Sequence, residues 1–223
     1  MNIRKIKGLK YPDEFFIKFF FKKGFDKKKN LTFLELGSSN GSNLMLPFQY
    51  DHKVIGVDMD KEQIQFANHN FKMVLSKNES SFYFDDMRSF VSNSKDLFVD
   101  VLLLPSSIYY ISKKDFVNFL KDLMKNRIVK SGTYFYLRYR NLKDYRYGMG
   151  DSKQGNNSFV LSDNCVTVDK GLLNVFYDDY EMIEILQKEL SISKFDLFSV
   201  ESQNIENDFK IFNSDSVIWG QIN

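Results

Sequence analysis

The sequence predicts an α/β protein with a seven-stranded, mostly parallel sheet, and three observations lead to this fold class. First, five strand-like segments alternate with helical periodicity, at residues 31–36, 52–60, 81–86, 100–105 and 132–140. Second, the core of segment 100–105 is an unbroken apolar run, typical of a parallel strand covered on both faces. Third, segments 195–203 and 215–223 flank a polar loop, so we expect an antiparallel hairpin at the sheet edge.

Helical periodicity fills the gaps between these strands, at residues 41–50, 61–71, 112–128 and 180–190. Pro47 shortens or kinks the first of these helices. The alternation predicts a Rossmann-like arrangement with helices on both faces of the sheet.

Residues 1–30 precede the alternation and are basic and aromatic, with ten Lys/Arg against three Asp/Glu. We expect a short helix here, with Pro12 in its first turn and Gly24 at its end. A solvated basic face is the common reason for such a charge bias, and attraction for an anionic substrate, an acidic partner or a membrane surface is the alternative. A second irregular segment, about 141–170, is polar and glycine-containing and is expected to be an insertion with short strands.

Composition excludes several classes of protein. No window approaches the ~18–20 apolar residues that a membrane-spanning helix needs. Cys165 is the single cysteine, so an intrachain disulfide is excluded and a cytoplasmic location is expected. The formal net charge of +2 is not that of a nucleic-acid-binding protein. The sequence does not predict an oligomeric state.

The segment 34–44, LELGSSNGSNL, joins the first strand to the following helix through a glycine-containing turn. A dinucleotide-binding loop needs glycines at positions 37, 39 and 42, and only Gly37 matches. A phosphate-binding loop needs a lysine after the glycines, which is absent. The register G-x-G-x-G is met by Gly37 and Gly41, with Ser39 at the middle position.

With Glu35 two residues before the first glycine, this loop resembles the methyl-donor loop of class I S-adenosylmethionine (SAM) methyltransferases. Three further strand ends carry the resemblance: Asp58 after the second strand, Asp85 and Asp86 after the third, and the opening at Pro105 after the fourth. The resemblance covers roughly residues 31–223, which we treat as the SAM-binding domain, and residues 1–30 would form a helical lid.

The resemblance implies SAM as the cofactor and assigns roles to individual residues. Glu35, Gly37, Ser39, Asn40 and Gly41 would hold the methionine end. The other predicted donor-binding residues are Asp58 and Met59 for the ribose and one adenine face, Asp85, Asp86 and Met87 for the adenine edge, Pro105, and Tyr11 as part of the lid.

Each of these features has a common structural explanation when taken alone. A two-glycine turn is usually just a turn, and an aspartate after a strand is often a helix cap. A competing motif is the Tyr-x-x-x-Lys spacing of short-chain dehydrogenases at 109–113 and 110–114, but the dinucleotide loop that these enzymes need is missing. Aminopropyl transfer on the same fold would need an acidic run after the fourth strand, and residues 105–110 contain none.

The residues predicted to bind the acceptor or take part in catalysis are Tyr109, Arg138, Arg140 and Tyr177. The two arginines end the fifth strand on one face and would clamp an anion, or would form structural salt bridges. Tyr177 and Asn174 belong to a segment that resembles an Asn-x-Phe-Tyr run before a late helix in some members of the superfamily, although Tyr177 would also suit a core position.

Histidine-driven or metal-assisted catalysis is not expected. His52 and His69, the two histidines, are expected at the surface, and no group of side chains is specific enough to predict a metal site.

The start of the chain, KYPDEFFIKFFF, and its end, DSVIWG, resemble small bacterial methyltransferases of surface-polysaccharide biosynthesis. This second resemblance implies O-methylation of a small acceptor, a sugar or a sugar-linked anionic group. The alternative is a SAM-binding partner subunit that has lost activity, because Ser39 replaces a glycine and no general base is evident.

Overall fold

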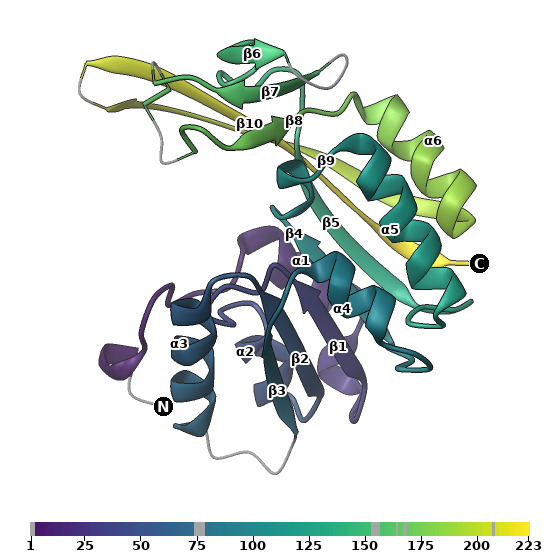
Figure 1. Cartoon of the computed structure of the whole chain (residues 1–223). Coiled ribbons are helices and arrows are strands. Elements are labelled where there is room, and N and C mark those ends of the chain that lie inside the picture. Colours follow the sequence, from purple (N-terminus) through teal and green to yellow (C-terminus); the bar gives the residue numbers. More distant parts are fainter. Residues whose placement is uncertain (1–2, 74–78, 153–156, 164, 167–168, 207) are drawn as a thin grey trace.

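The computed structural model describes residues 3–73, 79–152, 157–163, 165–166, 169–206 and 208–223. Its main sheet has seven strands in the order β3-β2-β1-β4-β5-β10-β9 (Figure 1). Their bounds are β1 Thr32–Leu36, β2 Lys53–Asp58, β3 Ser80–Phe84, β4 Val101–Pro105, β5 Tyr134–Arg140, β9 Ile192–Glu206 and β10 Phe209–Ile222. The first five are parallel, whereas β10 is antiparallel to both β5 and β9. The predicted fold class is therefore confirmed, including the terminal hairpin.

Helices cover both faces of this sheet, because strand residues alternate between two hydrophobic cores. In β4, Leu102 and Leu104 belong to the core beneath α4 (Met87–Asn93), α5 (Lys113–Lys125) and α6 (Asp179–Leu190). Val101 and Leu103 belong to the core beneath α1 (Glu14–Lys22), α2 (Met45–Gln49) and α3 (Lys61–Lys72). No helix among the described residues is long and apolar enough to cross a membrane.

The first helix is a packed layer of the domain. Phe16, Phe19 and Phe20 are fully buried on its inner face, and Phe19 packs on Tyr136 and Trp219 of the sheet. The helix begins at Glu14 with Asp13 as its N-cap, so Pro12 precedes the helix instead of lying in its first turn. Gly24 takes a left-handed conformation just beyond its end, as predicted.

Residues 3–13, which we call the strap, run over the loop after β1 before the helix begins. The main-chain N–H of Lys7 donates a hydrogen bond to the side chain of Asn70, and the carbonyl of Lys7 accepts one from the same side chain. The carbonyls of Lys7 and Leu9 also accept hydrogen bonds from Asn40. Because α1 is packed on the sheet, the part of residues 1–30 for which a lid is still predicted is the strap.

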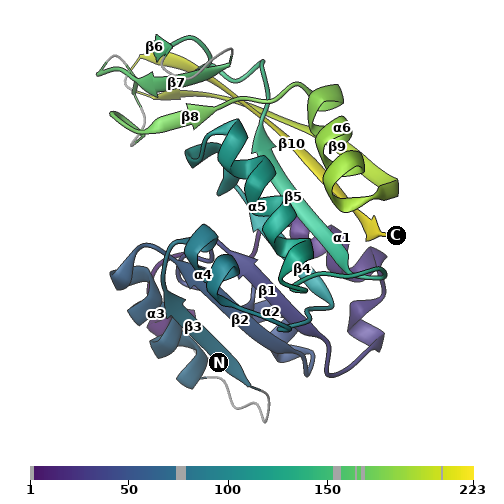
Figure 2. The ribbon, with the colours of Figure 1, turned by 45° about the vertical axis from the view of Figure 1, so that its right-hand side comes forward.

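The insertion contains a second, antiparallel sheet made of β6 (Gly150–Ser152), β7 (Ser158–Leu161) and β8 (Leu173–Val175). This small sheet lies beside the far part of the β9–β10 hairpin, as Figures 1 and 2 both show. The polar loop predicted between the last two strands was wrong, because residues 204–206 and 209–214 continue both strands. That part of the hairpin extends past the end of β5, and the insertion packs against it.

A cavity at the carboxyl ends of the parallel strands

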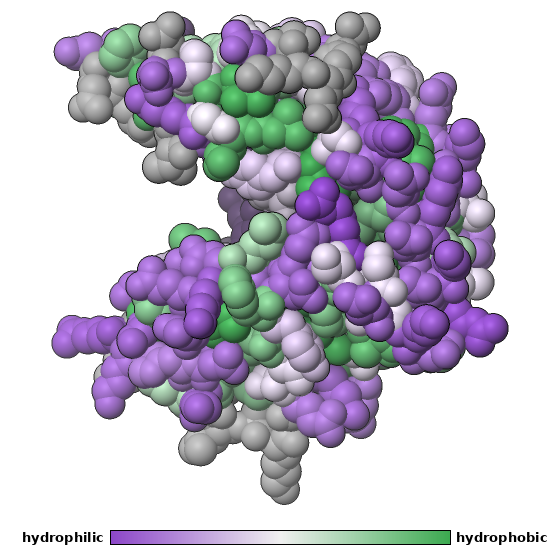
Figure 3. Space-filling view, in the orientation of Figure 1, coloured by the Kyte–Doolittle hydropathy of each residue, from purple (hydrophilic) through white to green (hydrophobic). Residues whose placement is uncertain are grey.

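A cavity of about 1140 Å³ lies at the carboxyl ends of the parallel strands. Figure 3 shows the molecule hollowed on this side, between the small sheet and the half of the sheet that holds β1–β3. The lining residues are Leu9, Tyr11, Pro12, Asp13, Glu35, Gly37, Ser38, Ser39, Ser42, Asn43, Val57, Asp58, Met59, Asp85, Asp86, Met87, Arg88, Pro105, Ser106, Ser107, Tyr109, Tyr110, Ile111, Leu172 and Leu173. Since a single small-ligand site is typically ~300–1,000 Å³, the cavity has room for two molecules.

The loop after β1 brings main chain to the cavity wall at a position where a side chain would not fit. Gly37 has a φ of +86°, and a Cβ there would overlap the Cβ of Ser107. Its N–H and that of Ser38 both donate to the carbonyl of Val57, which fixes the turn against β2. The predicted need for glycine at this position is explained by close approach and by the left-handed backbone.

Ser39 occupies the position where the motif register expects glycine, and it has a glycine-like backbone. Its φ is 47°, in the left-handed region. Its N–H donates to Oδ2 of Asp58 at 2.7 Å, and its Oγ donates to Oε1 of Gln63 at 3.1 Å. These bonds connect the first loop to the end of β2 and to α3. Gly41 (φ +75°) does not line the cavity, and a Cβ there would lie 2.8 Å from the ring of Phe71.

Glu35 is a buried carboxyl with one unused oxygen. Its side chain is 1% exposed, and Oε1 accepts a hydrogen bond from Nδ2 of Asn43 at 2.7 Å. Oε2 has no hydrogen-bond partner among the described residues. Burial raises the pKa of Glu35 from 4.5 to about 8, because the charged form loses its hydration. A ligand cation at Oε2 would satisfy this oxygen and favour the ionised form.

Asp58 at the end of β2 has a fixed orientation. Oδ2 accepts from Ser39 and Oδ1 accepts from the N–H of Asp60 at 2.8 Å. Asp60, not Asp58, caps α3, so Asp58 is not needed as a helix cap. Met59 follows it with 67% of its surface exposed, an apolar side chain available at the cavity wall.

The two aspartates after β3 differ in their partners. Asp86 caps α4 and also pairs with Arg88, whose Nη2 lies 2.7 Å from Oδ2; hydrogen bonding from Arg88 lowers the pKa of Asp86. The carboxylate of Asp85 makes no hydrogen bond within the described part of the chain. Both line the cavity with Met87 and Pro105, but Asp85 has the freer carboxylate. The helix α4 was not predicted, because seven residues are too few to show a periodic pattern.

Asn40 acts on the strap and does not line the cavity. It is 1% exposed, and its Nδ2 donates to the carbonyls of Lys7 at 2.6 Å and Leu9 at 2.8 Å. The strap in turn contributes Leu9 and Tyr11 to the cavity wall, and Tyr11 is 70% exposed. Of the predicted donor-binding residues, all but Asn40 and Gly41 therefore line one cavity.

Asp13 is a site residue that the sequence analysis missed. It lines the cavity, caps α1, and accepts hydrogen bonds from the hydroxyl of Tyr136 at 2.6 Å and from Nη1 of Arg138. Arg138 also pairs with Asp215, 2.7 Å from its Nη2. Arg138 does not line the cavity, and its charge is held by two carboxylates of the chain.

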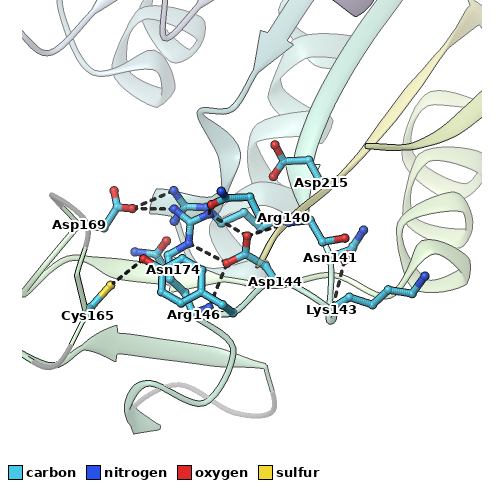
Figure 4. Close-up of polar contacts among 12 residues, drawn as sticks. Arg140, Asn141, Lys143, Asp144, Arg146, Cys165, Asp169, Asn174 and Asp215 are labelled. Carbon is cyan, nitrogen blue, oxygen red and sulfur yellow. Dashed lines mark hydrogen bonds and ion pairs between the residues drawn. The ribbon is translucent and has the colours of Figure 1, made fainter. Parts of the chain in front are cut away.

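The remaining predicted catalytic residues lie in different surroundings. Tyr109 lines the cavity, and its ring centroid lies 3.9 Å from the guanidinium carbon of Arg140. Arg140 is buried behind that ring, outside the cavity lining, and its Nη2 pairs with Asp169 at 2.9 Å (Figure 4). Tyr177 is fully buried in the core beside Phe116, and neither it nor Asn174 lines the cavity.

The histidines do not line the cavity either. His69 is exposed, as expected, but the expectation for His52 was wrong because this residue is fully buried. Its Nε2 lies 2.9 Å from the carbonyl of Phe25, and its Nδ1 accepts from the N–H of Leu31. Among the residues described, no three His, Cys, Asp or Glu side chains are grouped so as to hold a metal ion.

Comparison with solved structures identifies the arrangement of elements. A SAM-dependent methyltransferase of Methanosarcina mazei aligns with a TM-score of 0.63 and 16% identity, over 87% of this chain and 94% of that one. The fold is the Rossmann-like methyltransferase fold. The magnesium protoporphyrin IX methyltransferase of Synechocystis, solved with bound SAM, aligns with a TM-score of 0.55 and 10% identity, over 93% of this chain and 76% of that one.

The methyltransferase fold does not by itself fix the reaction. A precorrin 8W decarboxylase of Methanobacterium thermoautotrophicum aligns with a TM-score of 0.55 and 10% identity, over all 100% of this chain and 96% of that one. No family model matches the sequence, and a search of curated proteins also found no match. The function must therefore be inferred from the site itself.

Several lining residues carry no sequence signal of their own. Leu9, Ile111, Leu172 and Leu173 are ordinary apolar residues, and the fold alone brings them to one cavity. Ser106, in contrast, is indicated by the sequence, since it directly follows the buried fourth strand, where ligand-binding loops begin. It has a φ of 55°, a strained conformation for a residue other than glycine.

Proposed function

We propose that the protein is a SAM-dependent methyltransferase that acts on a small-molecule acceptor. The observation that carries the proposal is the arrangement of Glu35, Gly37, Asp58 and Asp85 around one cavity, at the ends of three neighbouring strands. Solved neighbours of the same fold are methyltransferases, one of them with bound SAM. The cavity residues fit this cofactor on chemical grounds, as follows.

Each part of the donor has a suitable partner. Oε2 of Glu35 is a buried acceptor without a partner among the described residues, suited to the ammonium group of the methionine end. The main chain at Gly37 allows close approach, and the carboxylate of Asp58 is oriented to accept hydrogen bonds from ribose hydroxyls. Met59 offers an apolar surface to the adenine ring, and Asp85 offers an acceptor for its amino group.

Bound SAM would supply a methyl group on a positively charged sulfur, which the lone pair of an acceptor oxygen or nitrogen displaces. The chain's contribution is to hold both molecules in line and to keep water away. The cavity lining carries five carboxyl groups, from Asp13, Glu35, Asp58, Asp85 and Asp86, and one basic group, from Arg88. Such a lining attracts the cationic donor more strongly than its neutral product, which favours product release.

The finer assignments remain proposals that rest on the sequence. A sugar or sugar-linked anionic acceptor follows only from the resemblance to polysaccharide-biosynthesis methyltransferases, and the structural neighbours lend it no support. A cytoplasmic location follows only from cysteine usage. The inactive partner subunit stays the second candidate, because Ser39 stands at a glycine position and no histidine lines the cavity.

Isothermal titration calorimetry with SAM, S-adenosylhomocysteine and NAD tests the proposal. We expect both sulfur compounds to bind, and Asp58→Ala to weaken them by about 2–3 kcal/mol, through loss of charge-assisted hydrogen bonds. Glu62→Ala is a matched control, because this exposed carboxylate does not line the cavity. Binding of NAD without binding of SAM would refute the proposal, and donor binding without turnover on any acceptor would favour the inactive subunit.

A further inference from the structure

The cavity has a second end that the donor residues do not occupy. Five residues form it, and we call them the acceptor end: Tyr109, Tyr110 and Ile111 after β4, and Leu172 and Leu173 next to and in β8. Leu9 of the strap lines the same cavity. All of these side chains are aromatic or aliphatic, which suits a ligand with flat or apolar faces.

The acceptor end offers no free charge to a ligand. Arg88 is the one basic residue in the described lining, and its guanidinium lies 2.7 Å from Asp86 and 3.5 Å from Asp115. Asp13, the last residue of the strap, accepts hydrogen bonds from Arg138 and Tyr136. An anionic acceptor would therefore enter an acidic cavity without finding an unpaired cation, at an electrostatic cost.

A buried charge cluster contacts Tyr109 and Tyr110, and its members Arg140, Asp144, Arg146 and Asp169 are shown in Figure 4. Arg140 and Arg146 both pair with Asp169, at 2.9 and 3.1 Å, and Arg146 also makes a double hydrogen bond to Asp144. Two arginines thus face two aspartates, so the cluster is neutral as a whole. Asp169 accepts a hydrogen bond from the hydroxyl of Tyr110 at 2.7 Å, which fixes that ring.

The same cluster weakens the attraction of Tyr109 for a cation. The guanidinium of Arg140 already lies over the ring of Tyr109, so this ring attracts a second cation less strongly. The rings of Tyr109 and Tyr110 meet edge to face, with centroids 4.5 Å apart and planes inclined by 60°. Tyr110 is 41% exposed and Tyr109 only 7%, so Tyr110 offers the larger ring surface to a ligand. The rings thus add little attraction for an amine, while the acidic lining disfavours carboxylates and phosphates.

We propose that the acceptor is a neutral, hydroxyl-bearing ring compound that stacks on the exposed ring of Tyr110, beside Tyr109, at the end of the cavity that Leu172 and Leu173 also line. The proposal rests on the proposed methyltransferase function and narrows its acceptor to uncharged compounds. The hydroxyl oxygen would form the new bond to the methyl carbon, the carbon–sulfur bond electrons would stay on sulfur, and the hydroxyl proton would leave to water.

Three ring-matched probes test the charge preference: para-cresol, para-hydroxyphenylacetate and tyramine, which are neutral, anionic and cationic. Each is titrated into protein saturated with S-adenosylhomocysteine and followed by saturation-transfer NMR. We expect para-cresol to bind at least about tenfold more tightly than either charged probe, a difference of about 1.4 kcal/mol. A preference for a charged probe, equal binding of all three, or no binding of para-cresol overturns the proposal.

A charge placed at the acceptor end should change this preference predictably. Leu172 is 48% exposed, so Leu172→Lys is tolerated by the fold and should shift binding towards para-hydroxyphenylacetate by about tenfold. Ile205→Lys is the matched control, because Ile205 is also exposed (72%) but lies in the hairpin outside the cavity lining. An equal shift in both variants would refute the location of the acceptor end.

The affinity for S-adenosylhomocysteine separates failure of this inference from failure of the proposed function. Leu172→Lys should leave that affinity within about twofold, since the residue is not among those assigned to the donor. Absence of S-adenosylhomocysteine binding to the unaltered protein would refute the proposed function itself. Normal S-adenosylhomocysteine binding with the wrong probe preference would refute only the neutral acceptor.

Discussion

Glu35 is expected to make the protein less stable as the pH rises, and Glu35→Gln should remove this effect. Burial raises the pKa of Glu35 from 4.5 to about 8 in the folded protein. Between these values the folded protein keeps a proton that the unfolded chain has lost. Because the unfolded state then binds fewer protons, the free energy of unfolding falls as the pH increases through this interval.

The size of the effect follows from the pKa difference. Each pH unit within the interval lowers the free energy of unfolding by about 1.4 kcal/mol. Over the whole interval, from 4.5 to about 8, the upper limit is therefore about 5 kcal/mol. Glutamine keeps the acceptor oxygen that Asn43 bonds but has no charge, so the variant avoids this loss.

Urea denaturation of the protein and of Glu35→Gln, without cofactor, measures the difference in their free energies of unfolding. Measurements at about pH 5, 7 and 9 cover the interval in which the carboxyl of Glu35 stays protonated only in the folded protein. We expect similar stability at the lowest pH and an advantage for the variant that grows to about 3–5 kcal/mol at the highest. Other titrating groups are common to both proteins and cancel in the difference. Glu62→Gln, an exposed carboxyl, controls for the loss of a surface charge.

A stability difference that does not change with pH would refute this reasoning about Glu35. A difference that grows as the pH falls would refute it more strongly, because it would mean that the folded protein favours the ionised carboxylate. Such a result would also remove the reason to assign a ligand cation to Oε2.

Three further perturbations test other parts of the site. Gly37→Ala places a Cβ against Ser107 in a left-handed turn, and urea denaturation should show a loss of about 2–4 kcal/mol, whereas Gly148→Ala (φ +80°, no neighbouring atoms) should lose only about 1 kcal/mol. Asn40→Ala removes two hydrogen bonds to the strap, worth about 1 kcal/mol each, so limited trypsin digestion should cut the strap faster while the rest of the chain stays protected. Asp169→Asn removes the negative charge that pairs with the buried guanidinium groups of Arg140 and Arg146. Thermal denaturation should show that the free energy of unfolding falls by about 3–5 kcal/mol. An unchanged midpoint temperature would refute the structural role of the cluster.

The donor side of the site could be predicted from sequence because its signals are local. Glu35, Gly37, Asp58 and Asp85 each lie at or just after the end of a strand, and strand ends can be found from short apolar runs. In a parallel sheet these ends lie at one edge, so the residues are neighbours by topology. The structure adds Ser39, whose left-handed backbone shows that the loop keeps the conformation of a glycine motif.

On the acceptor side, Tyr109 could be predicted because it closely follows a strand, but contacts between distant segments could not. Arg138 forms hydrogen bonds to Asp13, 125 residues away, and to Asp215, 77 residues away. No local pattern in the sequence predicts such pairs. Similarly, residues 204–206 and 209–214 mix polar side chains with apolar ones such as Ile211 and Phe212, and the polar ones are typical of a loop. Hydrogen bonding to the neighbouring strand decides their conformation instead.

The hairpin β9–β10 continues past the end of β5 and supports the small sheet beyond the parallel strands. The donor is assigned to residues before the insertion, whereas Leu172 and Leu173 of the acceptor end belong to it. Under the proposed function, natural selection can therefore alter residues 141–175 and change which compound is methylated, while the parallel strands keep the cofactor. The same division makes this segment the natural unit to exchange when designing chimaeras with new substrate specificity.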